Sequence, residues 1–282
     1  MSYLRQMRWI ILCIFIAISS SLYAVDGVVL INQSGALAGG ITPGDTPGFP
    51  VTISQSGSYR LASNLTLTAS DATAIEITAP NVTIDLNGFS IIGPGVCNIN
   101  AQGIAICPPP GQGVGVQGGT DQIVGTRSVT VRNGSVRGFS LNGIQLTGNG
   151  SSVERVAADG NFKAGFDVNG SVTNSSATGN GFDGIRALVV RDSTSVRNRR
   201  FGILIRSAGG AATGNISSFN GVEGISAANS RVIDNTVFSN LDTGILATCP
   251  SNVADNTVVD NGSNSIELVG SGCVVVNNAT RP

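Results

Sequence analysis

The chain has 282 residues, of which 38 are glycine and only 12% are charged, and its formal net charge is −1. It contains no histidine, which excludes a histidine base or a histidine-bound metal. Its 16 basic residues against 17 acidic ones give no sequence-independent attraction to nucleic acid, so no nucleic-acid partner is expected.

The first 24 residues have the composition of a secretory signal peptide. Arg5 and Arg8 precede an apolar run over residues 9–18, and small residues follow up to Ala24. Because this run is too short to span a bilayer, we expect cleavage near Ala24. The mature protein is then secreted or periplasmic, with no membrane span.

Residues 25–49 contain glycine and proline without an apolar period, so we expect a lead-in or N-terminal cap, and no amphipathic helix is visible there. Alternating Leu, Ile and Val then predict short strands over residues 50–92. Residues 93–120 interrupt the alternation and predict a loop that leaves the strands, one of two places where we expect function. The strand pattern resumes at Ile123.

From Ser128 onward the sequence repeats itself every 18–22 residues, and three residue types recur in step. Such co-varying repeats indicate stacked structural units. The first pattern pairs a small residue with an apolar one, at Gly143-Ile144, Gly165-Phe166, Gly184-Ile185, Gly202-Ile203, Gly224-Ile225, Gly244-Ile245 and Ser265-Ile266. The second lies twelve residues earlier, at Val131, Val153, Val172, Val190, Ala212, Val232 and Val253, and continues to Val274. The third is asparagine, at Asn161, Asn180, Asn198, Asn220, Asn240 and Asn261.

A unit of this length with frequent turn residues predicts short strands joined by bends, hence an all-β parallel solenoid. Leucine-rich repeats need several leucines per copy, whereas most copies here have one or none. We interpret the asparagines as a structural ladder with left-handed backbone and mutually bonded amides, and the glycines as bends with positive φ. The phenylalanines beside the ladders are expected to fill the interior: Phe139, Phe162, Phe166, Phe182, Phe201, Phe219 and Phe238.

Several segments carry a family resemblance: residues 53–67 (ISQSGSYRLASNLTL), 81–95 (NVTIDLNGFSIIGPG), and the N-G-x-x-G-I copies at 180–185 and 220–225. They resemble the right-handed parallel β-helix proteins of bacterial envelopes, in the pectate-lyase-like group that includes carbohydrate-binding proteins and sugar hydrolases. The resemblance implies one single-stranded right-handed parallel β-helix over residues 50–282. It does not assign an activity, because the group includes lyases, hydrolases and epimerases.

Four cysteines follow the signal peptide, and export would permit disulfides between them. We expect Cys97 to pair with Cys107, closing a proline-rich loop, and Cys249 to pair with Cys273, joining neighbouring coils. With no histidine and no C-x-x-C pair, a metal site is disfavoured. No cofactor is expected, although calcium would be compatible with the sequence.

Catalysis of glycoside hydrolysis needs two carboxylates about 5 to 10 Å apart. Asp234 and Asp255 share one offset in adjacent repeats and are the candidates, but both precede asparagine and also fit a turn. The Asp-rich motifs of β-helix pectin hydrolases and the Asp-Pro-His-Asp motif of alginate epimerases are absent. The sequence therefore leans away from an enzyme.

The second place where we expect function is a cluster of arginines within 21 residues: Arg186, Arg191, Arg197, Arg199, Arg200 and Arg206. Arginine's planar fork suits carboxylates on a polymer, and arginines on adjacent coils could stand in rows along one wall. A solvated wall balanced by Asp183 and Asp192 is the competing interpretation. The leading hypothesis is a non-catalytic, secreted protein that binds or supports acidic polysaccharide of the envelope. The alternatives are a polysaccharide lyase or hydrolase on the same scaffold, and a structural surface or adhesin module.

Overall fold

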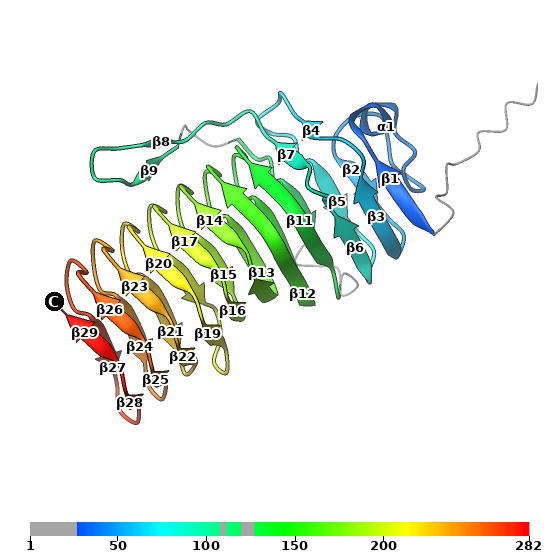
Figure 1. The fold of residues 1–282 in the computed structure, drawn as a ribbon. Coiled ribbons are helices and arrows are strands. Elements are labelled where there is room, and N and C mark those ends of the chain that lie inside the picture. Colours follow the sequence, from blue (N-terminus) through cyan, green and yellow to red (C-terminus); the bar gives the residue numbers. More distant parts are fainter. Residues whose placement is uncertain (1–26, 108–110, 120–126, 282) are drawn as a thin grey trace, which may run out of the picture.

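A computed structural model describes residues 27–107, 111–119 and 127–281 as a solenoid of parallel strands (Figure 1). The predicted signal peptide, residues 1–24, lies outside the described residues. The chain winds through three parallel sheets, here called walls 1, 2 and 3, and supplies each wall in turn. In the described part of the chain wall 1 has ten strands, so the solenoid has ten coils.

Wall 1 consists of β2 (Val51–Ile53), β5 (Ile75–Ile77), β10 (Val116–Gly118), the starts of β12 (Ile144–Asp159) and β13 (Phe166–Thr173), β15 (Ile185–Ala187), β18 (Ile203–Ile205), β21 (Ile225–Ala228), β24 (Ile245–Thr248) and β27 (Ile266–Val269). Wall 2 consists of β1 (Val28–Ile31), β3 (Gly57–Leu61), β6 (Val82–Asp85), the start of β11 (Thr130–Arg137), later parts of β12 and β13, β16 (Val189–Arg191), β19 (Ala211–Thr213), β22 (Arg231–Ile233), β25 (Asn252–Ala254) and β28 (Val274–Val276). Wall 3 consists of β4 (Leu65–Thr66), β7 (Ser90–Ile92), the ends of β11 and β12, β14 (Ser176–Thr178), β17 (Thr194–Val196), β20 (Ile216–Ser218), β23 (Thr236–Phe238), β26 (Thr257–Val259) and β29 (Ala279–Arg281).

The strand register confirms the repeat alignment drawn from the sequence. Ile203 of β18 pairs with Ile225 of β21, and Ile225 pairs with Ile245 of β24. The valine ladder is also correct until its last step, where Val253 pairs with Val275 and not with Val274. Apolar residues at alternate positions of the strands face inward and form the buried core, which ends before the last coil, where Leu268 and Val275 are exposed.

The asparagine ladder forms, but its backbone differs from the prediction. Each side-chain amide donates to the Oδ1 of the next asparagine at 2.8–3.0 Å, as between Asn180 and Asn198. None of the ladder asparagines has positive φ; the residue before each one does, such as Arg197 (56°) and Phe219 (55°). The bend is therefore made one residue earlier, and the buried asparagine fastens adjacent coils together.

The repeated glycines also serve a different purpose from the one predicted, because none of those from Gly143 to Gly244 has positive φ. A Cβ atom on Gly224 would lie 2.3 Å from Cγ1 of Val237 and 2.6 Å from Nδ2 of Asn240. These glycines therefore let the bend pack directly against the ladder.

Most of the phenylalanines are not interior residues. Phe139 and Phe166 are buried, but Phe162, Phe182, Phe201 and Phe238 are only partly buried, and Phe219 is 39% exposed. They lie in or beside the bend between walls 3 and 1, outside the inward-facing positions. The prediction that they fill the core was wrong for these five.

The solenoid begins earlier than the predicted boundary at residue 50, because β1 pairs with β3 on wall 2. Between β1 and β2 lies a short helix, α1 (Gln33–Ala38), which the sequence did not predict. The side chain of Asn32 caps it by accepting a hydrogen bond from the Gly35 N–H at 2.7 Å. At six residues it is too short to show an amphipathic period. No helix in the described residues is long and apolar enough to cross a membrane.

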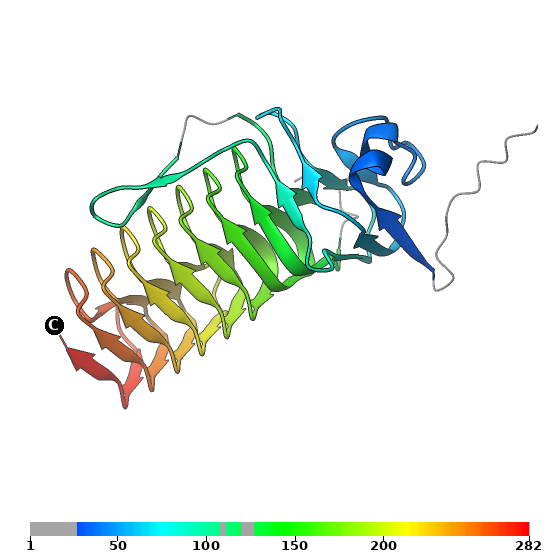
Figure 2. The same ribbon diagram turned by 45° about the horizontal axis from the view of Figure 1, so that its top comes forward.

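The insertion leaves wall 3 after β7 and stays outside the three walls. It forms an antiparallel hairpin of β8 (Asn98–Ile99) and β9 (Ala105–Ile106) that runs along the solenoid across several coils (Figures 1 and 2). We call residues 93–107 the strap. The chain re-enters wall 1 at β10, before Ile123, where the pattern had placed the return.

Candidate functional site

The arginine cluster is distributed around one coil of the solenoid. Arg186 lies on wall 1, and Arg191 lies at the end of wall 2. Arg197 directly follows wall 3, Arg199 and Arg200 lie in the next bend, and Arg206 follows the next strand of wall 1. The expected rows along one wall do not form, because 21 consecutive residues make about one full coil.

Half of the cluster belongs to an ion-pair network on wall 1. Arg186 lies 3.7 Å from Asp167 and 3.5 Å from Asp183, and Arg200 lies 3.9 Å from Asp183. Arg206 completes the network by pairing with Asp167. Asp167 was not among the counter-charges expected from the sequence, although the repeat register places it beside Arg186 on the adjacent strand.

Asp183 is the most buried member of this network, with a side chain only 3% exposed. Burial raises the pKa of its carboxyl, and the guanidinium groups of Arg200 and Arg186 offset part of that rise. The backbone N–H of Phe201 donates to its Oδ1 at 3.4 Å. A carboxyl held in this way is the kind of group that can exchange a proton with a ligand.

Aromatic rings hold Arg200 in place. Its guanidinium carbon lies 4.9 Å from the ring centre of Phe201 and 5.5 Å from that of Phe182. Phe182 in turn lies 6.3 Å from Phe162 on the preceding coil. Such contacts restrict the arginine side chain and so lower the entropy lost when it binds a ligand.

The other half of the cluster is not neutralised. Arg191, Arg197 and Arg199 are exposed, and none forms an ion pair with a carboxylate in the described part of the chain. Arg197 stacks over Phe219 at 5.5 Å. Arg199 follows ladder residue Asn198, and its equivalents on the adjacent coils are glycines, so its side chain has no large neighbour at that position.

A family model described as the right-handed β-helix region matches residues 113–280. The chain belongs to the right-handed β-helix family. Among solved structures, a variant of the periplasmic alginate epimerase AlgG is similar with a TM-score of 0.58 at 12% identity, covering 89% of this chain and 84% of that one. Unsubstituted AlgG gives 0.53 at 11% identity, covering 90% and 84%. The A-module of the Azotobacter vinelandii mannuronan C-5 epimerase AlgE4 gives 0.48 at 12%, covering 90% and 84%. At these identities the likeness concerns the fold. No curated protein matches the chain.

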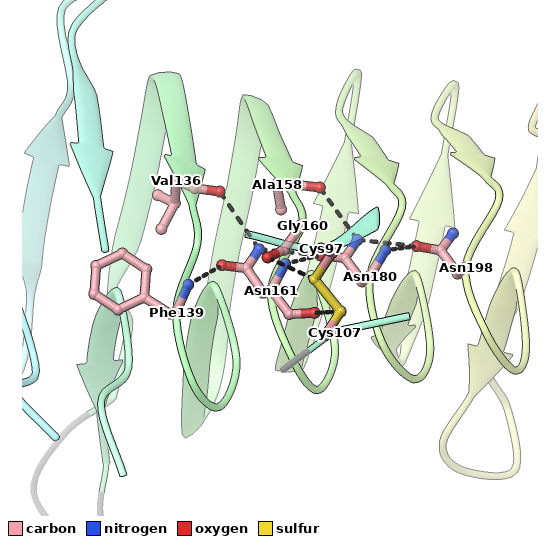
Figure 3. Close-up of a disulfide and its surroundings, with 9 residues drawn as sticks. All are labelled: Cys97, Cys107, Val136, Phe139, Ala158, Gly160, Asn161, Asn180 and Asn198. Carbon is pink, nitrogen blue, oxygen red and sulfur yellow. Dashed lines mark hydrogen bonds between the residues drawn. A yellow bond between two sulfur atoms is a disulfide. The ribbon is translucent and has the colours of Figure 1, made fainter. Parts of the chain in front are cut away.

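Both cysteine pairs expected in this β-helix are disulfide-bonded in the structure, Cys97 with Cys107 and Cys249 with Cys273. The second pair joins the bends between walls 1 and 2 of the last two coils, with Cys249 directly after β24 and Cys273 directly before β28. The first closes the strap hairpin on itself, and it lies against the bend that carries the asparagine ladder (Figure 3). There the sulfur of Cys97 lies 3.1 Å from the carbonyl oxygen of Gly160.

The carboxylate pair Asp234 and Asp255 lies at a different bend, between walls 2 and 3. Both residues are exposed and have positive φ, 58° and 57°, as the turn interpretation requires. Each precedes an asparagine of a second ladder, formed by Asn215, Asn235, Asn256 and Asn278. Neither aspartate forms an ion pair with an arginine of the cluster in the described residues.

The described residues contain no group of three or more acidic or cysteine side chains close enough together to hold a metal ion.

Proposed function

We propose that this protein is an exported, non-catalytic β-helix that binds acidic polysaccharide, such as a uronate polymer, through the un-neutralised arginines of one coil. The observation that carries the proposal is the pair Arg197 and Arg199, exposed on one bend with no described carboxylate to neutralise them. Guanidinium groups bind carboxylates through two parallel hydrogen bonds, and a polyuronate carries one carboxylate on every sugar.

Two further observations support the proposal. The similar structures of AlgG are of an alginate epimerase, so in that protein the same fold acts on an acidic polysaccharide. The two disulfides fit an oxidising compartment outside the cytosol, in agreement with the predicted signal peptide.

A second candidate function, cleavage of the bound chain, is favoured by one observation, the raised pKa of Asp183 between two arginines. Incubation with uronate oligosaccharides separates the two. Appearance of shortened or unsaturated products that Asp183→Asn abolishes would replace the binding protein with an enzyme.

The binding proposal is tested on an immobilised polyuronate column at low salt. The double substitution Arg197→Ala and Arg199→Ala should elute at markedly lower salt than the wild type, because both charges are exposed and screened by ions. Arg200 is left intact because it neutralises Asp183. Arg231→Ala, an exposed arginine on β22 of wall 2, is the matched control and should elute like the wild type. Equal elution of the double variant and the wild type contradicts the proposal.

A further inference from the structure

The strap encloses a groove against wall 3 with a volume of about 450 Å³. Its floor includes Gly138, Gly160 and Gly179, which occupy the same bend position on three successive coils and have φ of 73°, 60° and 62°. Its other side is the strap, including Val96 and Ile99. Since the strap crosses the coils, the groove follows the solenoid axis (Figures 1 and 2).

Glycine is needed where the strap meets the bend. A Cβ on Gly181 would lie 2.2 Å from the carbonyl oxygen of Phe162 on the preceding coil and 2.9 Å from the Sγ of Cys107 in the strap, closer than such atoms can approach. On the next coil, Arg199 occupies the position equivalent to Gly181, and Arg197 occupies the position equivalent to Gly179. The bend beneath the strap therefore has no side chains at these positions, and the arginines begin beside it.

Two arginines line this groove on coils that are three apart. Arg137 pairs with Asp159, Asp159 with Thr178, and Thr178 with Val196, the residue before Arg197. At about 4.8 Å per coil, Arg137 and Arg197 are separated along the axis by roughly 14 Å. Neither forms an ion pair with a described carboxylate, and residues 92–99 of the groove contain no charged side chain. Asp159, the register partner of Arg137, is the one carboxylate among the lining residues, so the groove has two positive charges against one negative charge. The arginine pair is thus suited to anions repeated along an extended ligand.

We propose that this groove is a binding subsite for a linear, carboxylate-bearing glycan that lies lengthwise beneath the strap, with Arg137 and Arg197 each binding one carboxylate. The inference rests on the proposed function and gives it a second contact, Arg137, and a direction along the axis. Val96 and Ile99 supply apolar surface for the faces of the sugar rings. Stacking on Phe219 holds the Arg197 guanidinium in position for the ligand.

The test measures the affinity of a fluorescent uronate oligosaccharide by anisotropy. Thr178→Trp should fill the groove, since Thr178 faces outward from wall 3 and lines it. Val196→Trp is the matched control, because Val196 is the register partner of Thr178 on the next coil and does not line the groove. Arg137→Ala removes the distal charge without adding bulk. Thermal melting checks that each variant folds.

We expect Arg137→Ala to weaken binding roughly tenfold, the effect of one lost charged hydrogen bond. Thr178→Trp should weaken it at least as much because the indole occupies the groove, while Val196→Trp matches the wild type. If both variants bind like the wild type while Arg197→Ala with Arg199→Ala does not, the glycan binds outside the groove. The subsite is then wrong and the proposed function stands. A wild-type protein that binds no uronate oligosaccharide overturns both.

Discussion

The backbone N–H and the side-chain amide of Asn198 both donate to the Oδ1 of Asn220, at 3.1 and 3.0 Å. Asn220 repeats the arrangement toward Asn240, at 3.0 and 2.8 Å. One carboxamide oxygen thus satisfies two buried donors of the preceding coil. The bend between walls 3 and 1 is therefore held by side chains as much as by backbone.

We predict that Asn220→Ala destabilises the protein by at least about 1 to 3 kcal/mol, because the buried backbone N–H of Asn198 loses its acceptor, while the side-chain amide of Asn198 keeps those of Ala177 and Ser195. Asn149→Ala is the control, since Asn149 is exposed and accepts a single side-chain bond from Asn169. Urea unfolding of both variants measures the difference. A loss for Asn220→Ala as small as that of the control would show that the ladder is dispensable.

A pair of glycine substitutions separates crowding from backbone strain. Gly224→Ala should cost about 1 to 3 kcal/mol or more, because the new Cβ would lie 2.3 Å from Val237 Cγ1. Gly209→Ala meets nothing within 4 Å but has φ of +79°, and should cost about 1 kcal/mol from strain alone. Thermal or urea unfolding ranks the two. The reverse order would mean that the bend relaxes around a side chain.

Asp183 should make stability depend on pH in a defined direction. Because burial raises its pKa above the ordinary 3.8, the folded state binds its proton more tightly than the unfolded state. Stability contributed by this group is therefore present at low pH and lost as pH rises through the folded-state pKa. We therefore expect the free energy of unfolding of Asp183→Asn, relative to that of the wild type, to be higher at pH 7 than at about pH 3.5. All other titratable groups are common to both proteins, so the change in this difference reports on Asp183. Unfolding free energies at the two pH values measure this, and a pH-independent difference would contradict it.

Asp159 lies in the strap groove and should oppose an anionic ligand. Loss of solvation raises the pKa of its carboxyl, and Arg137 offsets part of the rise. As pH falls through that raised pKa, Asp159 becomes neutral, so uronate affinity should increase. The strap residues of the groove carry no titratable side chain, and the other charged groups that line it are Arg137 and Arg197. The Asp159→Asn variant should bind uronate more tightly than the wild type at pH 7, and its affinity should not rise further as pH falls. Identical pH profiles of uronate affinity for the two proteins would show that Asp159 has no influence on binding.

Much of the fold could be predicted because stacked coils need similar residues at equivalent positions, which gives the sequence a regular period. Ile203, Ile225 and Ile245 recur at the register that the strands adopt. The same period contained the ion pair of Asp167 with Arg186, which is visible once the coils are aligned. A period fixes position along the chain but not which way a bend residue points, so Phe182 and Phe201 were assigned to the wrong side.

The candidate site was less predictable. Arg197 and Arg200 are three residues apart in sequence, yet one lines the strap groove and the other is held against Asp183 on wall 1. The two side chains separate because the chain bends from wall 3 to wall 1 between them: Arg197 directly follows wall 3, and Arg200 lies further along the bend toward wall 1. The position of the strap could not be predicted, because nothing in its composition states which coils it crosses.

The strap also determines how the rod would respond to tension. Coils of a solenoid are joined only to their neighbours, so a force applied at β29 would unzip them one at a time. The disulfide between Cys249 and Cys273 ties the first two coils in that path together. Further in, both sulfurs of the strap disulfide contact one bend from outside the sheets, Cys97 at Gly160 and Cys107 at Asn161. That coil could unfold only after the strap had separated from its bend, so we expect unfolding under force to slow at this coil.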